Sequence, residues 1–283
     1  MSRPSWRSKL LLTYSSWLLG PNWPVSGELD VIENVNSAST NEITLHTNQG
    51  CSISNSSVSS GTVVQSNCDI VATNNQGCSV HTSDSATFGE TFNTNQGGIY
   101  ATEWTSDAIN VWFFPRGNLP LDISLGKPDP TGWDTPLARF AGSCDIDEHI
   151  MNQQIESDLF TSILPLLIKS QVFDTSFCGD WAGVAWTSDS VCSSKAISCE
   201  QYVQNNPADF SGAYWAINSL KVYQDDGNLA APQPTPLPIS TNTSSSSAKA
   251  NITFSFSHAG PTVPYTFGSW SGHRTQEQCT EWI

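Results

Sequence analysis

The chain has 283 residues, enough for one large domain or two small ones with a buried core. Its 11 Lys and Arg against 26 Asp and Glu give a net charge of −15, which excludes nucleic-acid binding because too few cations are present to neutralise phosphates. Only 13% of the residues are charged, whereas 11 Trp, 12 Phe and 6 Tyr accompany many Ser, Thr and Asn. This composition suits a neutral, hydroxylated partner.

Residues 1–16 have the outline of a secretory leader, with Arg3, Arg7 and Lys9 ahead of an apolar run that ends at Leu19. Polar side chains break this run and no clear cleavage site follows. We therefore interpret residues 1–16 as either a leader or a mis-assigned start. No segment reaches the roughly 18 to 20 apolar residues that span a bilayer, so we expect no membrane partner.

The strand Glu28–Glu33 carries three carboxylates in six residues. In a regular strand Glu28 and Asp30 share one face and Glu33 points to the other, but a single bulge at Val31 or Ile32 returns Glu33 to the first face. All three acids then line one groove. The alternatives are a solvated acidic edge strand or calcium ligands, but the apolar Leu29, Val31 and Ile32 favour a strand fixed against a core.

Such a trio has a chemical use in glycoside hydrolysis. One carboxylate attacks or stabilises the anomeric carbon, and one protonated carboxylic acid donates to the leaving oxygen. Crowding of like charges raises the pKa of at least one carboxyl, which keeps a proton available near neutral pH.

Between about Trp17 and Tyr223 the apolar residues alternate or form short runs bounded by Gly, Pro, Asn and Asp, which is typical of strands. In Glu42–Thr47 the alternation places Ile43 and Leu45 on one face and Thr44 and His46 on the other. Further strands are predicted at 100–105, 110–114, 172–177 and 215–223, with one or two helical turns in 201–214. Short strands with almost no amphipathic helix predict an all-β, antiparallel sandwich.

None of the eight cysteines forms a C-x-x-C pair, which argues against zinc and for disulfides. Cys68 with Cys78, and Cys192 with Cys199, are the local pairings that we favour. Glycosylation sequons at Asn55, Asn242 and Asn251 agree with a secreted protein. From about Asp225 the chain becomes Pro- and Ser-rich, so we assign residues 225–283 to a linker and tail.

The motif Glu-Leu-Asp-Val-Ile-Glu resembles the E-x-D-x-x-E signature of glycoside hydrolase family 16, in its bulge-containing, laminarinase-like branch. Further blocks resemble secreted fungal endo-β-1,3(4)-glucanases in the same order: Trp17–Pro24 (WLLGPNWP), Thr44–Thr47 (TLHT), Tyr100–Thr105 (YATEWT), Val111–Gly117 (VWFFPRG) and Phe177–Gly183 (FCGDWAG). The resemblance covers roughly Trp17 to Tyr223, and we take residues 17–224 as the catalytic domain.

The resemblance implies a concanavalin-like β-jelly roll whose concave face forms a glucan cleft. It also implies Glu28 as nucleophile, Glu33 as general acid/base and Asp30 as the assisting acid. His46 matches a histidine beside the catalytic strand, where it contacts the sugar or the nucleophile, although a hydrogen-bonded strand histidine is the alternative. The substrate-binding candidates are Trp23, Trp181 and, more weakly, Trp17, whereas we assign Trp112, Trp186 and Trp215 to the core.

The function implied is an endo-acting, retaining hydrolase of β-1,3 and mixed β-1,3/1,4 glucans, secreted and monomeric. The chemistry needs no metal or organic cofactor, and β-glucan is the partner. The alternatives are a glucan-binding, lectin-like module, a wall transglycosylase or an inactive fragment. A lectin would not need both Glu28 and Glu33, but hydrolysis and transglycosylation use the same carboxylates.

The sequence departs from the family pattern in three ways. The signature strand lies almost at the start of the chain, so we expect a jelly roll without its N-terminal strands. Residues 156–171 separate Ile155 from Val172, which are adjacent in the pattern, and we interpret them as a retained intron or an error in the gene sequence. Seven cysteines lie in the matched region, and an odd number predicts one without a partner.

Overall fold

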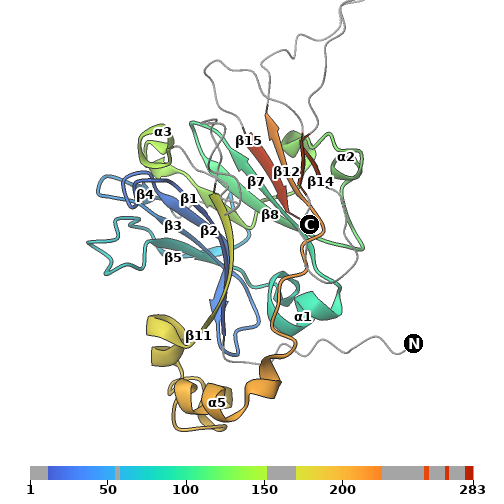
Figure 1. Cartoon of the computed structure of the whole chain (residues 1–283). Coiled ribbons are helices and arrows are strands. Elements are labelled where there is room, and N and C mark those ends of the chain that lie inside the picture. Colours follow the sequence, from blue (N-terminus) through green and yellow to red (C-terminus); the bar gives the residue numbers. More distant parts are fainter. Residues whose placement is uncertain are drawn as a thin grey trace, which may run out of the picture.

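A computed structural model describes residues 12–54, 58–151 and 170–224, together with the backbone of three short strands at 252–254, 265–267 and 278–282. Two antiparallel β-sheets face one another, as the strand patterning predicted (Figure 1). The three sequons, residues 156–169 of the suspected insert and the Pro/Ser-rich linker lie outside the described residues.

The larger sheet has the strand order β11-β1-β2-β3-β6-β5. Its strands are β1 (Leu12–Leu19), β2 (Glu28–Val35), β3 (Glu42–His46), β5 (Thr62–Gln65), β6 (Cys78–His81) and β11 (Ser170–Phe177). The carboxylate strand β2 therefore lies inside this sheet, paired with β1 on one side and β3 on the other.

The second sheet has the order β12-β15-β7-β8-β9. Its strands are β7 (Gly98–Trp104), β8 (Ile109–Pro115), β9 (Ala138–Phe140), β12 (Leu220–Gln224) and β15 (Gln278–Trp282). Two pairs, β4 (Ser52–Ile53) with β10 (Gly142–Ser143) and β13 (Ile252–Phe254) with β14 (Tyr265–Phe267), form small separate sheets. The strand predicted over 215–223 begins only at Leu220.

The helices are short. They are α1 (Gly89–Thr94), α2 (Leu121–Ser124), α3 (Ile146–His149), α4 (Ser190–Ser193) and α5 (Cys199–Asn205), with single turns η1 (Ser85–Thr87), η2 (Pro130–Gly132), η3 (Gly179–Gly183) and η4 (Pro207–Phe210). The helical turns predicted in 201–214 are present as α5 and η4. In the part of the chain that the structure describes, no helix has the length and apolarity to cross a membrane.

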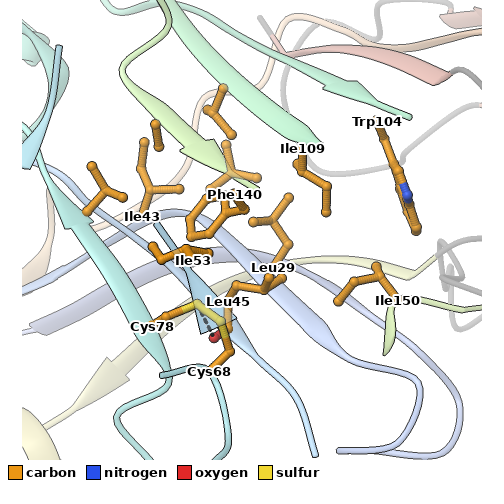
Figure 2. Close-up of a cluster of buried hydrophobic side chains, with 14 of the residues drawn as sticks. Leu29, Ile43, Leu45, Ile53, Cys68, Cys78, Trp104, Ile109, Phe140 and Ile150 are labelled. Atoms are coloured by element: carbon orange, nitrogen blue, oxygen red, sulfur yellow. Dashed lines mark hydrogen bonds between the residues drawn. A yellow bond between two sulfur atoms is a disulfide. The ribbon is translucent and has the colours of Figure 1, made fainter. Parts of the chain in front are cut away.

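The main core fills the space between the two sheets (Figure 2). Leu29 of β2 and Ile43 and Leu45 of β3 face Ile109 and Phe140 of the second sheet, and each is at most 1% exposed. Burying such a side chain contributes roughly 1.5–3 kcal/mol. The alternation predicted for β3 is thus confirmed, and this packing fixes which face of β2 and β3 points outward.

Trp112 and Trp186 are buried, as predicted. Trp186 lies in a second apolar cluster with Cys178, Cys192 and Cys199. Trp215 is half-buried and packs edge-on against Phe173 of β11.

Three disulfides form among the described residues: Cys51–Cys144, Cys68–Cys78 and Cys178–Cys199. The predicted pair Cys68–Cys78 is confirmed, but the predicted pair Cys192–Cys199 is wrong. The turn η3 brings Cys178, at the end of β11, against the first residue of α5, with the two Cα atoms 5.7 Å apart. Cys192 is left as a buried free cysteine.

The strands of the two sheets extend beyond the predicted bounds of the catalytic domain and into the suspected insert. Strand β1 begins at Leu12, within the segment interpreted as a leader, and β11 includes Ser170 and Gln171 of the suspected insert. Strand β15, from the segment assigned to the tail, pairs with β12 and β7. The division into leader, catalytic domain and tail stays a prediction.

The disulfides give the first testable expectation. Cys51–Cys144 spans 93 residues of sequence and Cys68–Cys78 spans 10, so the longer loop constrains the unfolded chain more. Replacing Cys51 and Cys144 by Ala should lower the free energy of unfolding by about 4–5 kcal/mol, against about 2–3 kcal/mol for the Cys68 and Cys78 pair. Urea unfolding of the two double variants measures the difference, and the reverse order would contradict it.

Candidate active site

The predicted bulge is present in β2. Asp30 pairs with Thr44 of β3 and Glu33 pairs with Glu42, so that the two residues Val31 and Ile32 face one residue of β3. The register with β1 shifts at the same level. Leu29 and Val31 point into the core, and the extra residue returns Glu33 to the face of Glu28 and Asp30.

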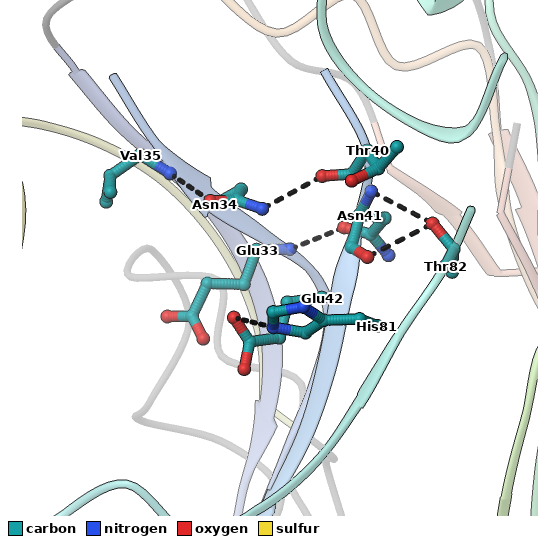
Figure 3. A network of polar contacts seen from close by, with 8 residues as sticks. All are labelled: Glu33, Asn34, Val35, Thr40, Asn41, Glu42, His81 and Thr82. Carbon is teal, nitrogen blue, oxygen red and sulfur yellow. Dashed lines mark hydrogen bonds and ion pairs between the residues drawn. The ribbon is translucent and has the colours of Figure 1, made fainter. Parts of the chain in front are cut away.

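The side chain of Asn41 holds this bulge (Figure 3). Its Oδ1 accepts a hydrogen bond from the backbone N–H of Glu33 at 2.9 Å, and its Nδ2 donates to the carbonyl of Val31 at 2.8 Å. The Asn41 backbone N–H in turn donates to the hydroxyls of Thr82 and Thr87. Asn41 is 1% exposed, so its amide replaces the ladder bonds that the bulge breaks.

Burial and neighbouring carboxylates raise the pKa of all three carboxyls. Burial, then the charge of Asp30, raises the pKa of Glu28 to about 7, while His46 and a side-chain hydrogen bond with Trp23 oppose the shift. Burial and then Glu42 raise the pKa of Asp30. Burial, followed by Asp30, holds the pKa of Glu33 well above its usual value, with further contributions from Glu42 and Glu28 and an opposing one from His46. The site therefore retains protons near neutral pH.

His46 lies beside the two more N-terminal carboxyls. It is paired with Glu28 across the β2–β3 ladder, and its Nε2 lies 3.1 Å from Oδ2 of Asp30. A Cβ at Gly77 would lie 2.8 Å from His46 Nδ1, and Gly77 has a φ of +63°, so a glycine is required for the ring to occupy this place. The ring therefore contacts a carboxyl of the candidate site, and the predicted role of His46 towards the sugar or the nucleophile stays a prediction.

The candidate tryptophans lie around the carboxylate strand. Trp17 is half-buried on β1, where it pairs with Asp30. Trp23 is 42% exposed in the turn before β2. Trp181 is 39% exposed on η3, and this turn docks on the far end of β2 because Asn36 Nδ2 donates to the carbonyl of Ala182. The two exposed rings thus belong to segments at opposite ends of β2.

Four further residues of the site were not identified from the sequence. Ser15 Oγ lies 3.4 Å from Oε1 of Glu33, Glu42 pairs with Glu33, and His81 Nε2 lies 2.9 Å from Oε2 of Glu42. The fourth is Asn41. The alternation of β3 could have revealed Glu42, which shares the face of Thr44 and His46, but no local pattern marks Asn41, Ser15 or His81.

The family model described as "XgeA-like, catalytic GH16 domain" matches residues 14–164 and 165–223. An endo-1,3(4)-β-glucanase of Arthroderma benhamiae is 43% identical over 213 residues, covering 74% of this chain and 43% of the relative. A probable glycosidase of Schizosaccharomyces pombe is 41% identical over 212 residues, covering 74% and 46%. The chain therefore spans less than half the length of these curated relatives.

Solved structures similar to this chain belong to the same family as its sequence relatives. Laminarinase 16A from Phanerochaete chrysosporium, described with two β-glucans in donor and acceptor sites, superimposes with a TM-score of 0.62 at 35% identity over 75% of this chain and 67% of that chain. An elongating family 16 β-1,3-glucosyltransferase gives 0.60 at 34% identity, covering 74% and 66%. This similarity confirms the predicted jelly roll.

Asn41 provides a test of how the bulge is held. Asn41→Ala leaves a part-buried N–H and a buried carbonyl of β2 without these partners, and an unsatisfied buried group costs about 1–3 kcal/mol. We expect urea unfolding to show a loss of about 2–4 kcal/mol, against less than about 0.5 kcal/mol for Asn95→Ala at an exposed position. Similar losses in the two variants would show that Asn41 does not support the strand.

The raised pKa of Glu28 predicts a pH-dependent stability. Between its ordinary value of 4.5 and about 7 the folded protein binds this proton more tightly than the unfolded chain, so the free energy of unfolding falls as pH rises through that window. Glu28→Gln should reduce this fall by up to about 3 kcal/mol. Urea unfolding from pH 4.5 to 8 measures it, and identical pH slopes for variant and parent would contradict the burial of an ionisable Glu28.

Proposed function

Because the chain belongs to glycoside hydrolase family 16, we propose that it is an endo-acting, retaining hydrolase of β-1,3 and mixed β-1,3/1,4 glucans. The observation that supports this most is the bulge of β2, which gathers Glu28, Asp30 and Glu33 on one face of the sheet. Two carboxyls with different proton affinities are what glycoside hydrolysis requires.

The environments of the two glutamates suit different roles. Glu28 faces fewer acids than Glu33 and has a side-chain hydrogen bond with Trp23, so Glu28 ionises first as pH rises and Glu33 keeps its proton longer. Glu28 then attacks the anomeric carbon, while Glu33 donates its proton to the departing sugar oxygen. In the second step Glu33 takes a proton from water, and the resulting hydroxide breaks the Glu28 ester. Each carboxyl is thereby restored.

Asp30 and His46 act on the nucleophile. Asp30 lies between the glutamates along β2 and is 2% exposed, and His46 is paired with Glu28 while its ring contacts Asp30. We assign Asp30 to the orientation of Glu28 and to the control of its charge. His46 supplies a hydrogen bond to Asp30 or to a sugar hydroxyl.

A neutral glucan fits the remaining features of the site. Trp23 and Trp181 expose ring surface that can stack on the apolar faces of glucose, and Trp17 lies on the strand beside Asp30. Relatives are named endo-1,3(4)-β-glucanases, and a similar laminarinase is described with bound β-glucans. The disulfides suit an oxidising compartment, so we place the protein outside the cell, as a monomer acting on wall or storage glucan.

Transfer to a sugar in place of water is the second candidate. The similarity to an elongating β-1,3-glucosyltransferase favours it, because the same carboxylates perform the first step of both reactions. A glucan-binding module without catalysis would keep the tryptophans but would gain nothing from a bulge that places a third acid beside two others.

Incubation with laminarin and with lichenan tests the proposal. We expect new reducing ends and, by NMR, a first product of β-configuration. Glu28→Gln and Glu33→Gln should each lower kcat/KM by at least about 10²- to 10⁴-fold, because each removes a group that reacts directly.

Glu90→Gln, at an exposed glutamate of α1, is the matched control and should retain activity. Chain redistribution without new reducing ends would instead establish transfer. Glucan binding without hydrolysis or transfer would contradict the proposal that the protein is an enzyme. An α-configured first product would contradict the retaining mechanism.

A further inference from the structure

A fourth carboxylate stands in the site, outside the E-x-D-x-x-E motif. Glu42 lies directly opposite Glu33 across the β2–β3 ladder, a position at which Cβ atoms are about 4.5–5.5 Å apart. Both side chains point to the same side of the sheet, and that of Glu42 is only 18% exposed (Figure 3). Two charged carboxylates so placed repel one another, so the arrangement favours the state in which one of them holds a proton.

His81 contacts one of these two carboxyls, that of Glu42. It pairs with Glu42 on the other side of β3, and its Nε2 lies 2.9 Å from Oε2 of Glu42. The ring is about half exposed and contacts Glu42 (Figure 3). Among the described residues, the Glu33 carboxyl accepts a hydrogen bond from the hydroxyl of Ser15 at 3.4 Å, which is long and uncharged. The Glu42 carboxyl therefore has the closer polar partner of the two.

Of the other charged groups around Glu33, the carboxyls oppose its ionisation and His46 favours it. From β2 itself Glu28 and Asp30 face it and oppose its ionisation, and from β3 only His46 favours ionisation. Glu42 adds to the rise in the pKa of Glu33 and also to that of Asp30. Glu42 thus interacts with both Asp30 and Glu33.

We propose that Glu42, held in place by His81, is a positioning residue of the reaction: its carboxylate faces the Glu33 carboxyl and keeps that group in its acid form until a leaving oxygen takes the proton. This inference rests on the proposed function, in which Glu33 is the general acid/base. After the proton has passed to the departing sugar, the Glu33 carboxylate stands beside Glu42 and takes a proton from the attacking water more readily. Glu42 itself exchanges no proton and touches no reacting atom.

A proton titration of Glu33 tests the inference without any substrate. The protein is labelled with ¹³C at the glutamate side-chain carboxyls, the Glu33 signal is assigned by its loss in Glu33→Gln, and its midpoint is followed by NMR. We expect Glu42→Gln to lower the Glu33 midpoint by about one pH unit, a tenfold change in proton affinity. Glu42→Asp, which withdraws the charge by one methylene, should give a smaller shift in the same direction and replaces Glu42→Gln if that variant fails to fold.

Glu90→Gln, which removes one exposed carboxylate from α1, should leave the Glu33 midpoint unchanged. His81→Gln should also lower the midpoint, because the Glu42 carboxylate is no longer held against Glu33. An unchanged Glu33 midpoint in both Glu42 variants would overturn the inference.

The pH profile of kcat/KM on laminarin gives the second readout. If Glu33 is the general acid, the alkaline limb in Glu42→Gln should move to lower pH by the same amount as the NMR midpoint, while the rate on the plateau changes little. A shifted midpoint with an unshifted alkaline limb would overturn the role of Glu42 in the reaction and contradict the assignment of Glu33 as general acid. The coupling of the two carboxyls and the proposed function can thus fail separately.

Discussion

The site depends on the single extra residue in β2. Side chains alternate along a strand, so a regular β2 would place the carboxyl of Glu33 among the apolar side chains between the sheets. The bulge reverses the phase after Asp30, while Leu29 and Val31 stay packed in the core. Asn41 makes this possible because one side-chain amide satisfies both the N–H of Glu33 and the carbonyl of Val31. A buried asparagine thus turns a backbone irregularity into a defined structure.

The gathered acids make the site electrostatically unfavourable in the resting protein. Four carboxyls, Glu28, Asp30, Glu33 and Glu42, lie on neighbouring positions of two strands, and the two histidines His46 and His81 each contact one of them. The proton affinities of these acids rise in consequence, which costs stability at neutral pH but, in the proposed reaction, supplies an acid and a base to the same bond. The apolar packing beneath β2 and β3 and the long-range disulfide Cys51–Cys144 offset that cost.

Features set by the local sequence were predictable, and features set by contacts between distant segments were not. The Glu28–Glu33 spacing implied the bulge because only a bulge brings all three acids to one face, and alternation gave the core positions Ile43 and Leu45. The role of Asn41 and the contact of His81 depend on the register of β3 with its two neighbours, which no local pattern specifies. The Cys178–Cys199 disulfide was missed for the same reason: η3 folds back on α5, whereas proximity in sequence favoured Cys192.

Trapping of the glycosyl-enzyme tests the central claim most directly, namely that the bulge presents Glu28 as nucleophile and Glu33 as acid/base. A 2-deoxy-2-fluoro-β-glucosyl donor with a good leaving group slows breakdown of the ester more than its formation, so the labelled protein accumulates and its peptides can be analysed by mass spectrometry. The account predicts one added sugar, located on Glu28 and absent from Glu28→Gln. A sugar on Glu33 or Asp30, or full turnover without any labelled protein, would contradict it.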